Sequence, residues 1–297
     1  MQVVIGGASG FLGTHLTREL ESRGHAVTRL VRRPAAAADE SRWDPASGVV
    51  DPEVIESADV VVNLAGAPTA GNPHSQTWAD NLRRSRVDST ATLASAIAAS
   101  ERKPAFLAGN GISAYGDHGT EPLTESADAR GDSLLTEVSQ VWEAAATPAK
   151  QAGARVCILR TAPVMDRRSQ PLKILRVLFT LGLGGRLGDG RQYFPMVSLR
   201  DWVGGVAHLA EHPEASGAFN LCCPVTPTNV EFTQALGRAV GRPALIPVPA
   251  FAIKVGAARM APELLGSLNT VPQALLDAGY EFRDHDVTEV LAAGLGR

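Results

Sequence analysis

The first thirteen residues, Met1-Gln-Val-Val-Ile-Gly-Gly-Ala-Ser-Gly-Phe-Leu-Gly13, decide the fold class. Three apolar residues at 3–5 predict a short buried strand, and a glycine-rich turn follows it. Leu12, Leu16 and Leu20 then recur at a spacing of four, which indicates one face of a helix. A strand that leads through glycines into a helix is typical of nucleotide-binding α/β proteins.

The glycines of this turn stand three apart, at Gly7, Gly10 and Gly13. Glycine permits a tight turn, close approach of a pyrophosphate to the backbone, and close packing of helix on strand. The helix N-terminus also offers free N–H groups and a partial positive charge. The spacing differs from G-x-G-x-x-G, and an ordinary strand–helix turn is the alternative. We expect dinucleotide contacts from Gly7, Ser9, Gly10, Phe11, Leu12 and Gly13.

The end of the second predicted strand, at 25–31, indicates which dinucleotide binds. NAD-binding chains carry Asp or Glu about 20 residues past the last glycine, where it bonds the ribose 2′-hydroxyl. This chain has Arg32, nineteen residues after Gly13, and Arg33 follows it. A guanidinium pairs with a 2′-phosphate that a carboxylate would repel. The sequence therefore favours NADP(H), and a solvated basic loop is the alternative interpretation.

Composition and charge exclude several other classes. The chain has 297 residues and a net charge of −3, which gives no electrostatic reason to expect nucleic acid or an anionic membrane as partner. Its three cysteines show neither a disulfide framework nor zinc-ligand spacing, and we predict no metal site. A strand beginning at residue 2 leaves no room for a signal peptide, and no apolar run reaches about 20 residues. We expect a cytoplasmic protein.

Strands alternate with helices along the chain, which predicts a parallel sheet. The predicted fold is α/β, a Rossmann-type doubly wound parallel sheet with a smaller C-terminal substrate lobe. We assign 1–165 to an NADP-binding Rossmann domain, completed by 196–222, and 166–195 with 223–297 to the substrate lobe. The predicted elements include a strand at 105–108 and helices at 78–100, 133–152, 199–211 and 229–240.

Motifs spread over the whole chain support a family resemblance. They include the glycine turn, Asp59-Val-Val-Val-Asn-Leu-Ala-Gly66, Ser85-Arg-Val-Asp-Ser-Thr90, Tyr115-Gly116, Trp142-Glu143, Leu159-Arg-Thr161, Gly184-Gly-Arg-Leu-Gly-Asp-Gly-Arg-Gln192 and Val248-Pro-Ala250. With these motifs the chain resembles an atypical extended short-chain dehydrogenase/reductase of the NAD(P)-dependent epimerase/dehydratase-like family. The resemblance implies a substrate pocket between the two lobes, and homodimerisation through the helices at 78–100 and 133–152.

The resemblance also implies further cofactor contacts. They come from the turn Leu64-Ala65-Gly66 and from the pair Pro163 and Val164, which would lie near the nicotinamide. Arg86 stands where relatives have a residue that faces the cofactor. A solvated face shared with Arg83 and Arg84 is the alternative for Arg86.

The expected catalytic pair is missing. Short-chain dehydrogenases use Tyr-x-x-x-Lys, in which the lysine lowers the tyrosine pKa, and no tyrosine here has a lysine four residues on. The corresponding helix has Val138 and Trp142 at these positions, and we expect Trp142 to pack in the core. Our catalytic candidates are Asn110, Ser113 and Tyr115, and each also has a purely structural interpretation as part of a turn.

Two functions remain open at this point. The first is an NADP(H)-binding oxidoreductase or epimerase-like enzyme that acts on a small hydroxyl or carbonyl compound or on a nucleotide-sugar-like substrate. The alternative is a non-catalytic NADP(H)-sensing regulatory protein, in which the cofactor controls a partner interface. The missing Tyr-x-x-x-Lys pair favours the sensor. The loop at Gly184-Gly185 and the pair Arg191-Gln192 are interpreted as pocket lining and favour the enzyme.

Overall fold

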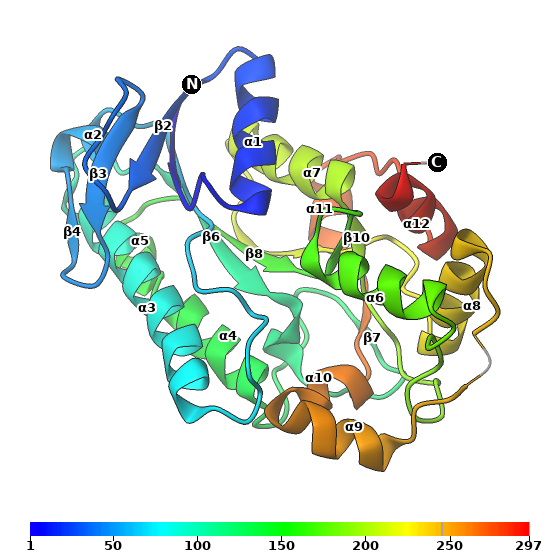
Figure 1. Ribbon diagram of the computed structural model, residues 1–297. Helices are drawn as coiled ribbons and strands as arrows, with labels where there is room; N and C mark the ends of the chain where they lie inside the picture. Colours follow the sequence, from blue (N-terminus) through cyan, green and yellow to red (C-terminus); the bar gives the residue numbers. More distant parts are fainter. Residues whose placement is uncertain (245, 297) are drawn as a thin grey trace.

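An eight-stranded sheet organises the chain, and its strand order reverses beside the first strand (Figure 1). The computed structural model describes residues 1–244 and 246–296. All neighbouring strands of the sheet are parallel except β4, which runs antiparallel to β3. The order is β11 (Gly217–Leu221), β8 (Val156–Thr161), β6 (Ala105–Gly111), β5 (Val60–Asn63), β1 (Gln2–Gly6), β2 (Ala26–Val31), β3 (Glu40–Asp44) and β4 (Val49–Val50).

This order confirms the predicted Rossmann-type sheet. From β1 the chain builds outward through β2 and β3, and it then returns to build β5, β6 and β8 on the other side. In open α/β sheets, ligands bind outside the carboxyl ends of the strands at such a reversal. The crevice at the ends of β1 and β5 is therefore where a cofactor site is expected.

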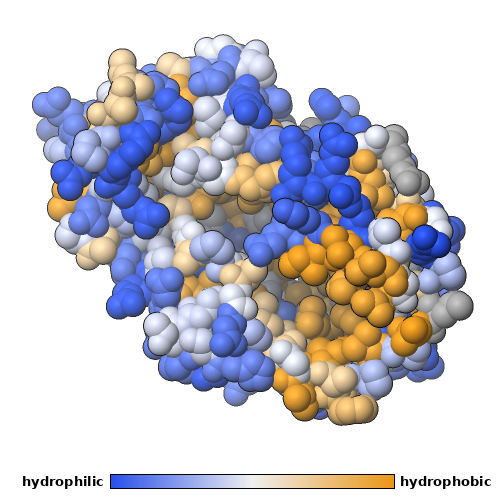
Figure 2. Space-filling view, viewed as in Figure 1, coloured by the Kyte–Doolittle hydropathy of each residue, from blue (hydrophilic) through white to orange (hydrophobic). Residues whose placement is uncertain are grey.

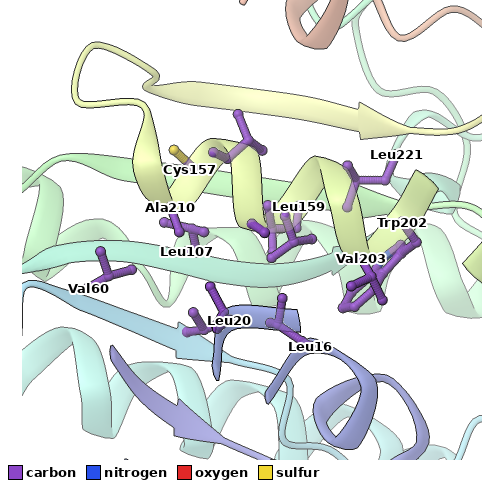
Figure 3. Close-up of a cluster of buried hydrophobic side chains, with 14 of the residues drawn as sticks. Leu16, Leu20, Val60, Leu107, Cys157, Leu159, Trp202, Val203, Ala210 and Leu221 are labelled. Carbon is purple, nitrogen blue, oxygen red and sulfur yellow. The ribbon is translucent and has the colours of Figure 1, made fainter. Parts of the chain in front are cut away.

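Helices α1 (Phe11–Ser22) and α7 (Leu199–Glu211) cover one face of the sheet. Leu16 and Leu20 of α1 and Trp202 of α7 are completely buried among the strand side chains, as Figure 3 shows. Complete burial contributes roughly 1.5–3 kcal/mol for a leucine side chain. This packing holds the N-terminus of α1 at the crevice.

The opposite face is covered by α2 (Pro52–Glu56), α3 (Gln76–Ala99), α4 (Leu134–Ala144) and α5 (Thr147–Gln151). The single helix predicted at 133–152 is wrong, because α4 and α5 are separate. Pro148 lies at the start of α5 and has no N–H to continue the α4 ladder. Ser133 caps α4 by accepting a hydrogen bond from the Thr136 N–H at 3.3 Å.

Strand β6 continues three residues beyond its predicted end at 108. Gly109, Asn110 and Gly111 pair in register with β8, so the backbone stays in the sheet until the 3-10 turn η1 (Ile112–Tyr115). From the sequence we expect a turn here, because glycine and asparagine have low strand propensity and are common in turns. Pairing with β8 overrides that preference.

We call the remaining elements the C-terminal lobe, and several of them pack around a small core that contains Phe179, Phe232 and Leu291. Leu275 of α11 instead packs in the core between the sheet and α7. Helix α8 begins with a capping box between Thr228 and Glu231, at its predicted boundary. No helix in the described residues is long and apolar enough to cross a membrane. The lobe comprises α6 (Gln170–Thr180), α8 (Asn229–Val240), α9 (Ala250–Ala257), η2 (Ala258–Met260), α10 (Ala261–Leu265), α11 (Gln273–Asp277) and α12 (Val287–Leu295), with the short pairs β9 (Val164–Met165)–β10 (Val197–Ser198) and β7 (Pro122–Leu123)–β12 (Asn269–Thr270).

Candidate functional site

In the glycine turn after β1, two glycines are packed against neighbouring backbone and the third faces open space. Gly7 has φ +82°, and a Cβ there would lie 2.6 Å from the carbonyl carbon of Leu64. A Cβ on Gly13 would lie 2.3 Å from the Gly7 carbonyl oxygen. Gly10 is exposed, and its only close neighbour would be the same oxygen at 3.2 Å. A ligand can therefore reach the backbone at Gly10, while Gly7 and Gly13 keep strand and helix close together.

The N-terminus of α1 faces this opening. Gly10 is its N-cap and supplies no side-chain cap, and the first turn carries no acidic residue. The first N–H groups of a helix have no intrahelical acceptor and carry a partial positive charge. Ser9 is exposed, and Phe11 and Leu12 are half-buried beside it. This arrangement suits a phosphate group.

At the end of β2, Arg32 and Arg33 differ in their surroundings. Arg33 donates to both carboxylate oxygens of Glu40, at 2.7 and 2.8 Å, and this lowers the pKa of Glu40 to about 2. Arg32 is exposed and makes no hydrogen bond or ion pair with any described residue. Arg42, another exposed arginine, lies opposite Val31 on β3, and sequence analysis missed it.

A buried polar network fixes the turn after β5. The Asn63 side chain donates to the hydroxyls of Ser89 (3.2 Å) and Thr90 (2.8 Å), and its oxygen accepts the Ala65 N–H at 3.1 Å. Trp142 donates its indole N–H to Thr90 at 2.8 Å. Trp142 is thus a hydrogen-bonding member of the site as well as a packing residue, which spacing alone did not indicate.

Arg86 lies against this turn without an acidic partner among the described residues. Its side chain passes Gly66, where a Cβ would come within 3.3 Å of the Arg86 Cγ. The guanidinium donates to the Ala67 carbonyl and the Thr69 hydroxyl, both at 3.1 Å, and lies 5.0 Å from the Trp142 ring centre. Its burial lowers the pKa of Arg86 to about 10. A half-buried cation bonded only to neutral groups is suited to an anionic ligand.

Asn110 and Ser113 occupy different environments at the end of β6. Asn110 is buried, its amide nitrogen donates to the Ser139 carbonyl at 3.0 Å, and its oxygen accepts the Gly111 N–H at 2.7 Å. Ser113 is half-buried and donates to Glu263 of α10 at 2.6 Å. Sequence analysis did not identify Glu263.

Tyr115, the third candidate, is only 1% exposed. Its hydroxyl donates to the Asn220 side chain at 2.7 Å and accepts a hydrogen bond from Arg160 at 2.9 Å. Burial raises the pKa of Tyr115, and the nearby Arg160 opposes this shift. The phenol is thus satisfied inside the protein, under the turn that carries Ser113.

The remaining predicted residues lie where the two lobes meet. Val164 is buried in β9, and the half-buried Pro163 accepts the Val197 N–H at 3.2 Å. Gln192 is buried and donates to the carbonyls of Leu187 and Leu264, both at 3.1 Å. Gln192 thus joins segments of the lobe. Between the lobes, the surface in Figure 2 is hollowed.

Comparison with known proteins identifies the family. Residues 3–222 match the profile of the NAD dependent epimerase/dehydratase family. The chain belongs to this family. Residues 248–293 match a domain of unknown function, DUF1731, which contains α9, α10 and Glu263.

Members of the epimerase/dehydratase family resemble this chain over its whole length. Epimerase family protein ML0860 of Mycobacterium leprae is 37% identical over 291 residues, covering 98% of this chain and 94% of that protein. The human epimerase family protein SDR39U1 is 33% identical over 289 residues, covering 95% of each.

Two solved structures share this fold at 31% sequence identity. The crystal structure of human SDR39U1 (isoform 2) with NADPH has a TM-score of 0.89 and 31% identity, covering 100% of this chain and 99% of that one. A nucleoside-diphosphate sugar epimerase from Corynebacterium glutamicum has a TM-score of 0.82 and 31% identity, covering 100% of this chain and 58% of that one.

Proposed function

We propose that this chain is an NADP(H)-dependent oxidoreductase or epimerase-like enzyme that acts on a hydroxyl or carbonyl compound. The observation that carries the proposal is the turn between β1 and α1, which is sealed at Gly7 and Gly13 and open at Gly10. The free N-terminus of α1 and the guanidinium of Arg86, which has no acidic partner among the described residues, both suit the phosphates of a dinucleotide.

The exposed Arg32 supports a preference for the 2′-phosphorylated cofactor. It stands at the end of β2, makes no bond with a described residue, and has the exposed Arg42 on the neighbouring strand. The crystal structure of the related human protein contains NADPH. Arg33 contributes less in this proposal, because Glu40 already holds its guanidinium.

When bound, the cofactor supplies a hydride to a substrate carbon or removes one from it. The residues of this chain then have to hold the reacting oxygen and move its proton. We assign the first task to the Ser113 hydroxyl and the second to Glu263, which lies 2.6 Å from it. Asn110 and Tyr115 position the turn that carries Ser113 through their buried hydrogen bonds.

The alternative of an NADP(H)-sensing protein is supported by α4, where Val138 and Trp142 occupy the positions of the usual Tyr and Lys. The two functions are separated by supplying NADPH with a panel of aldehydes, quinones and nucleotide sugars. Oxidation of NADPH by any of them supports the enzyme. NADPH binding without turnover, together with a cofactor-dependent change in protein association, supports the sensor. Absence of NADPH binding would refute both.

A further inference from the structure

Exposed apolar side chains are concentrated on one part of the C-terminal lobe. Thirteen large apolar side chains are exposed in the described residues, and eight of them lie within 174–183 and 246–255. Monomeric proteins rarely expose contiguous apolar patches larger than a few hundred Å², and larger patches commonly mark binding sites. The eight are Ile174, Val177, Leu178, Leu181, Leu183, Ile246, Phe251 and Val255.

Helix α6 shows that this exposure is not a by-product of core packing. Ile174, Val177, Leu178 and Leu181 follow the i, i+3, i+4, i+7 spacing of a single helical stripe, and all four are exposed. The core of the lobe is contacted by other residues of the helix, including the buried Phe179. The helix therefore has a second apolar face that no described residue covers.

The exposed residues of α6 and α9 belong to one continuous structure. Leu187, in the loop after α6, bridges to Val248 just before α9, and Gly188 donates to the Val248 carbonyl at 2.9 Å. Gln192 connects the same loop to Leu264 in α10. We call the eight exposed residues on this structure the α6–α9 wall. In Figure 2 an apolar band lies over this region and borders the central hollow.

The α6–α9 wall leads to the proposed reaction site. Helix α9 is followed directly by η2 and α10, and α10 carries Glu263, which accepts the hydrogen bond of Ser113 at 2.6 Å. A molecule bound at Ser113 would thus lie beside the segment that carries part of this apolar surface. The continuity between wall and reaction site indicates a substrate as its occupant.

The charged residues around the wall are all basic in the two segments that form it. The sequence has neither Asp nor Glu in 167–188 or in 242–262. Lys173, Arg176 and Lys254 are exposed among the apolar residues of the wall. Charge complementarity therefore favours a ligand with an acidic group beyond its apolar part.

We propose that the α6–α9 wall binds the hydrocarbon chain of an amphipathic, acidic substrate whose carbonyl or hydroxyl carbon reaches Ser113. This inference rests on the proposed function and narrows its substrate class. The sugar hydroxyls of a nucleotide sugar would need hydrogen-bond partners, which the eight side chains of the wall lack. A hydrocarbon chain gains free energy by leaving water against the same surface.

Binding can be tested without turnover, by displacement of the fluorescent probe 1-anilinonaphthalene-8-sulfonate. We expect decanoate to displace the probe, butyrate to displace it far less, and decanol to be weaker than decanoate. Val177→Asp and Phe251→Asp should lower decanoate affinity at least tenfold. Val49→Asp is the matched control, since Val49 is 58% exposed on the distant β4, against 52% for Val177 and 72% for Phe251. Equal displacement by butyrate and decanoate, or equal loss in the control, would overturn the proposal.

Activity provides a second readout. With NADPH and straight-chain aldehydes, kcat/KM should rise about fourfold per added methylene until the wall is filled. NADPH supplies the hydride, and water supplies the proton that reaches the new alkoxide through Glu263 and Ser113, so one aldehyde becomes one alcohol for each NADPH oxidised. A flat series in a protein that binds NADPH refutes this inference and leaves the proposed function standing. Failure of NADPH binding refutes the function itself.

Two other occupants give distinct results. If the wall is the interface between two copies of the chain, light scattering will show a dimer that Val177→Asp converts to a monomer. If it contacts a membrane, the protein will sediment with phosphatidylglycerol vesicles and Phe251→Asp will release it. Either result, without selective decanoate binding, overturns the proposal. A protein that binds decanoate, does not sediment with vesicles and keeps its oligomeric state in Val177→Asp supports it.

Discussion

The Ser113 hydroxyl lies 2.6 Å from a carboxylate oxygen of Glu263, although 150 positions separate the two residues in the chain. The other carboxylate oxygen of Glu263 accepts a hydrogen bond from Ser133 at 2.8 Å. Two serines of the sheet-bearing part of the chain thus hold one carboxylate of the C-terminal lobe. A carboxylate in this position can accept a proton through Ser113. The tyrosine of the Tyr-x-x-x-Lys pair, which usually has this role, is replaced here by Val138.

This relationship predicts that Ser113→Ala and Glu263→Gln lower kcat by about 10²–10⁴-fold, the usual contribution of general acid–base catalysis. NADPH affinity should change little, because neither residue belongs to the glycine turn. Ser126→Ala, at an exposed serine, is the control. Steady-state kinetics and calorimetric titration separate the two effects. Full kcat in both variants would remove Ser113 and Glu263 from the mechanism.

Tyr115→Phe should act on stability more than on catalysis. Removing the hydroxyl leaves the Asn220 oxygen without its 2.7 Å donor and removes one acceptor of Arg160. An unsatisfied buried polar group costs about 1–3 kcal/mol of unfolding free energy. Urea denaturation of Tyr115→Phe should show a loss in this range, with kcat within a few-fold of the parent. A large fall in kcat at unchanged stability would instead make Tyr115 the proton donor.

Local sequence patterns were enough to place some of the candidate site residues in the fold. Spacing alone places the glycines at 7, 10 and 13 after β1, because they directly follow its apolar residues in the sequence. It likewise places the arginine at 32 at the end of β2. Helices α7 and α8 were predicted at their observed bounds, since apolar periodicity and capping residues determine them locally.

Contacts between distant residues could not be predicted in this way. Nothing near Glu263 indicates that it faces Ser113, because α10 reaches η1 only through the folding of the lobe. Arg32 and Arg33 look equivalent in sequence, and only pairing of β2 with β3 brings Glu40 to Arg33. Likewise, Asn110 reads as part of a turn until pairing with β8 places it in a buried strand.

Cofactor choice should depend on Arg32. One charge-assisted contact to the 2′-phosphate contributes roughly 1.5–3 kcal/mol, which is about ten- to a hundredfold in affinity. We expect NADPH to bind more tightly than NADH, and Arg32→Asp to erase or invert the preference. Arg33→Ala should have a smaller effect because Glu40 holds that guanidinium. Equal affinity of the parent for the two cofactors in calorimetry would refute the assignment.

The open position of the glycine turn is tested by Gly10→Val. A Cβ at Gly10 meets only the Gly7 carbonyl oxygen, at 3.2 Å, so the fold should tolerate it, while the added methyl groups occupy the approach to the backbone. NADPH affinity should fall by orders of magnitude, with an unchanged circular dichroism spectrum. Gly10→Ala should give an intermediate loss. Normal NADPH binding by Gly10→Val would place the cofactor elsewhere.

Arg86 and Arg83 offer a matched comparison on one helix. Arg83 is exposed and pairs with Glu137 at 2.7 Å, whereas Arg86 has no acidic partner among the described residues and its burial lowers its pKa to about 10. If the Arg86 guanidinium binds an anionic group of the cofactor, Arg86→Met should lower the NADPH affinity about ten- to a hundredfold through loss of a charge-assisted contact. Arg83→Met loses an exposed ion pair, typically worth 0–1 kcal/mol, and should bind NADPH normally. An anion binds the charged form of Arg86, so the NADPH affinity of the parent should fall as the pH rises past 10, where the free guanidinium loses its proton, while the affinity of Arg86→Met should show no such step. Equal NADPH affinities of the two variants would show that Arg86 serves only the packing of the turn.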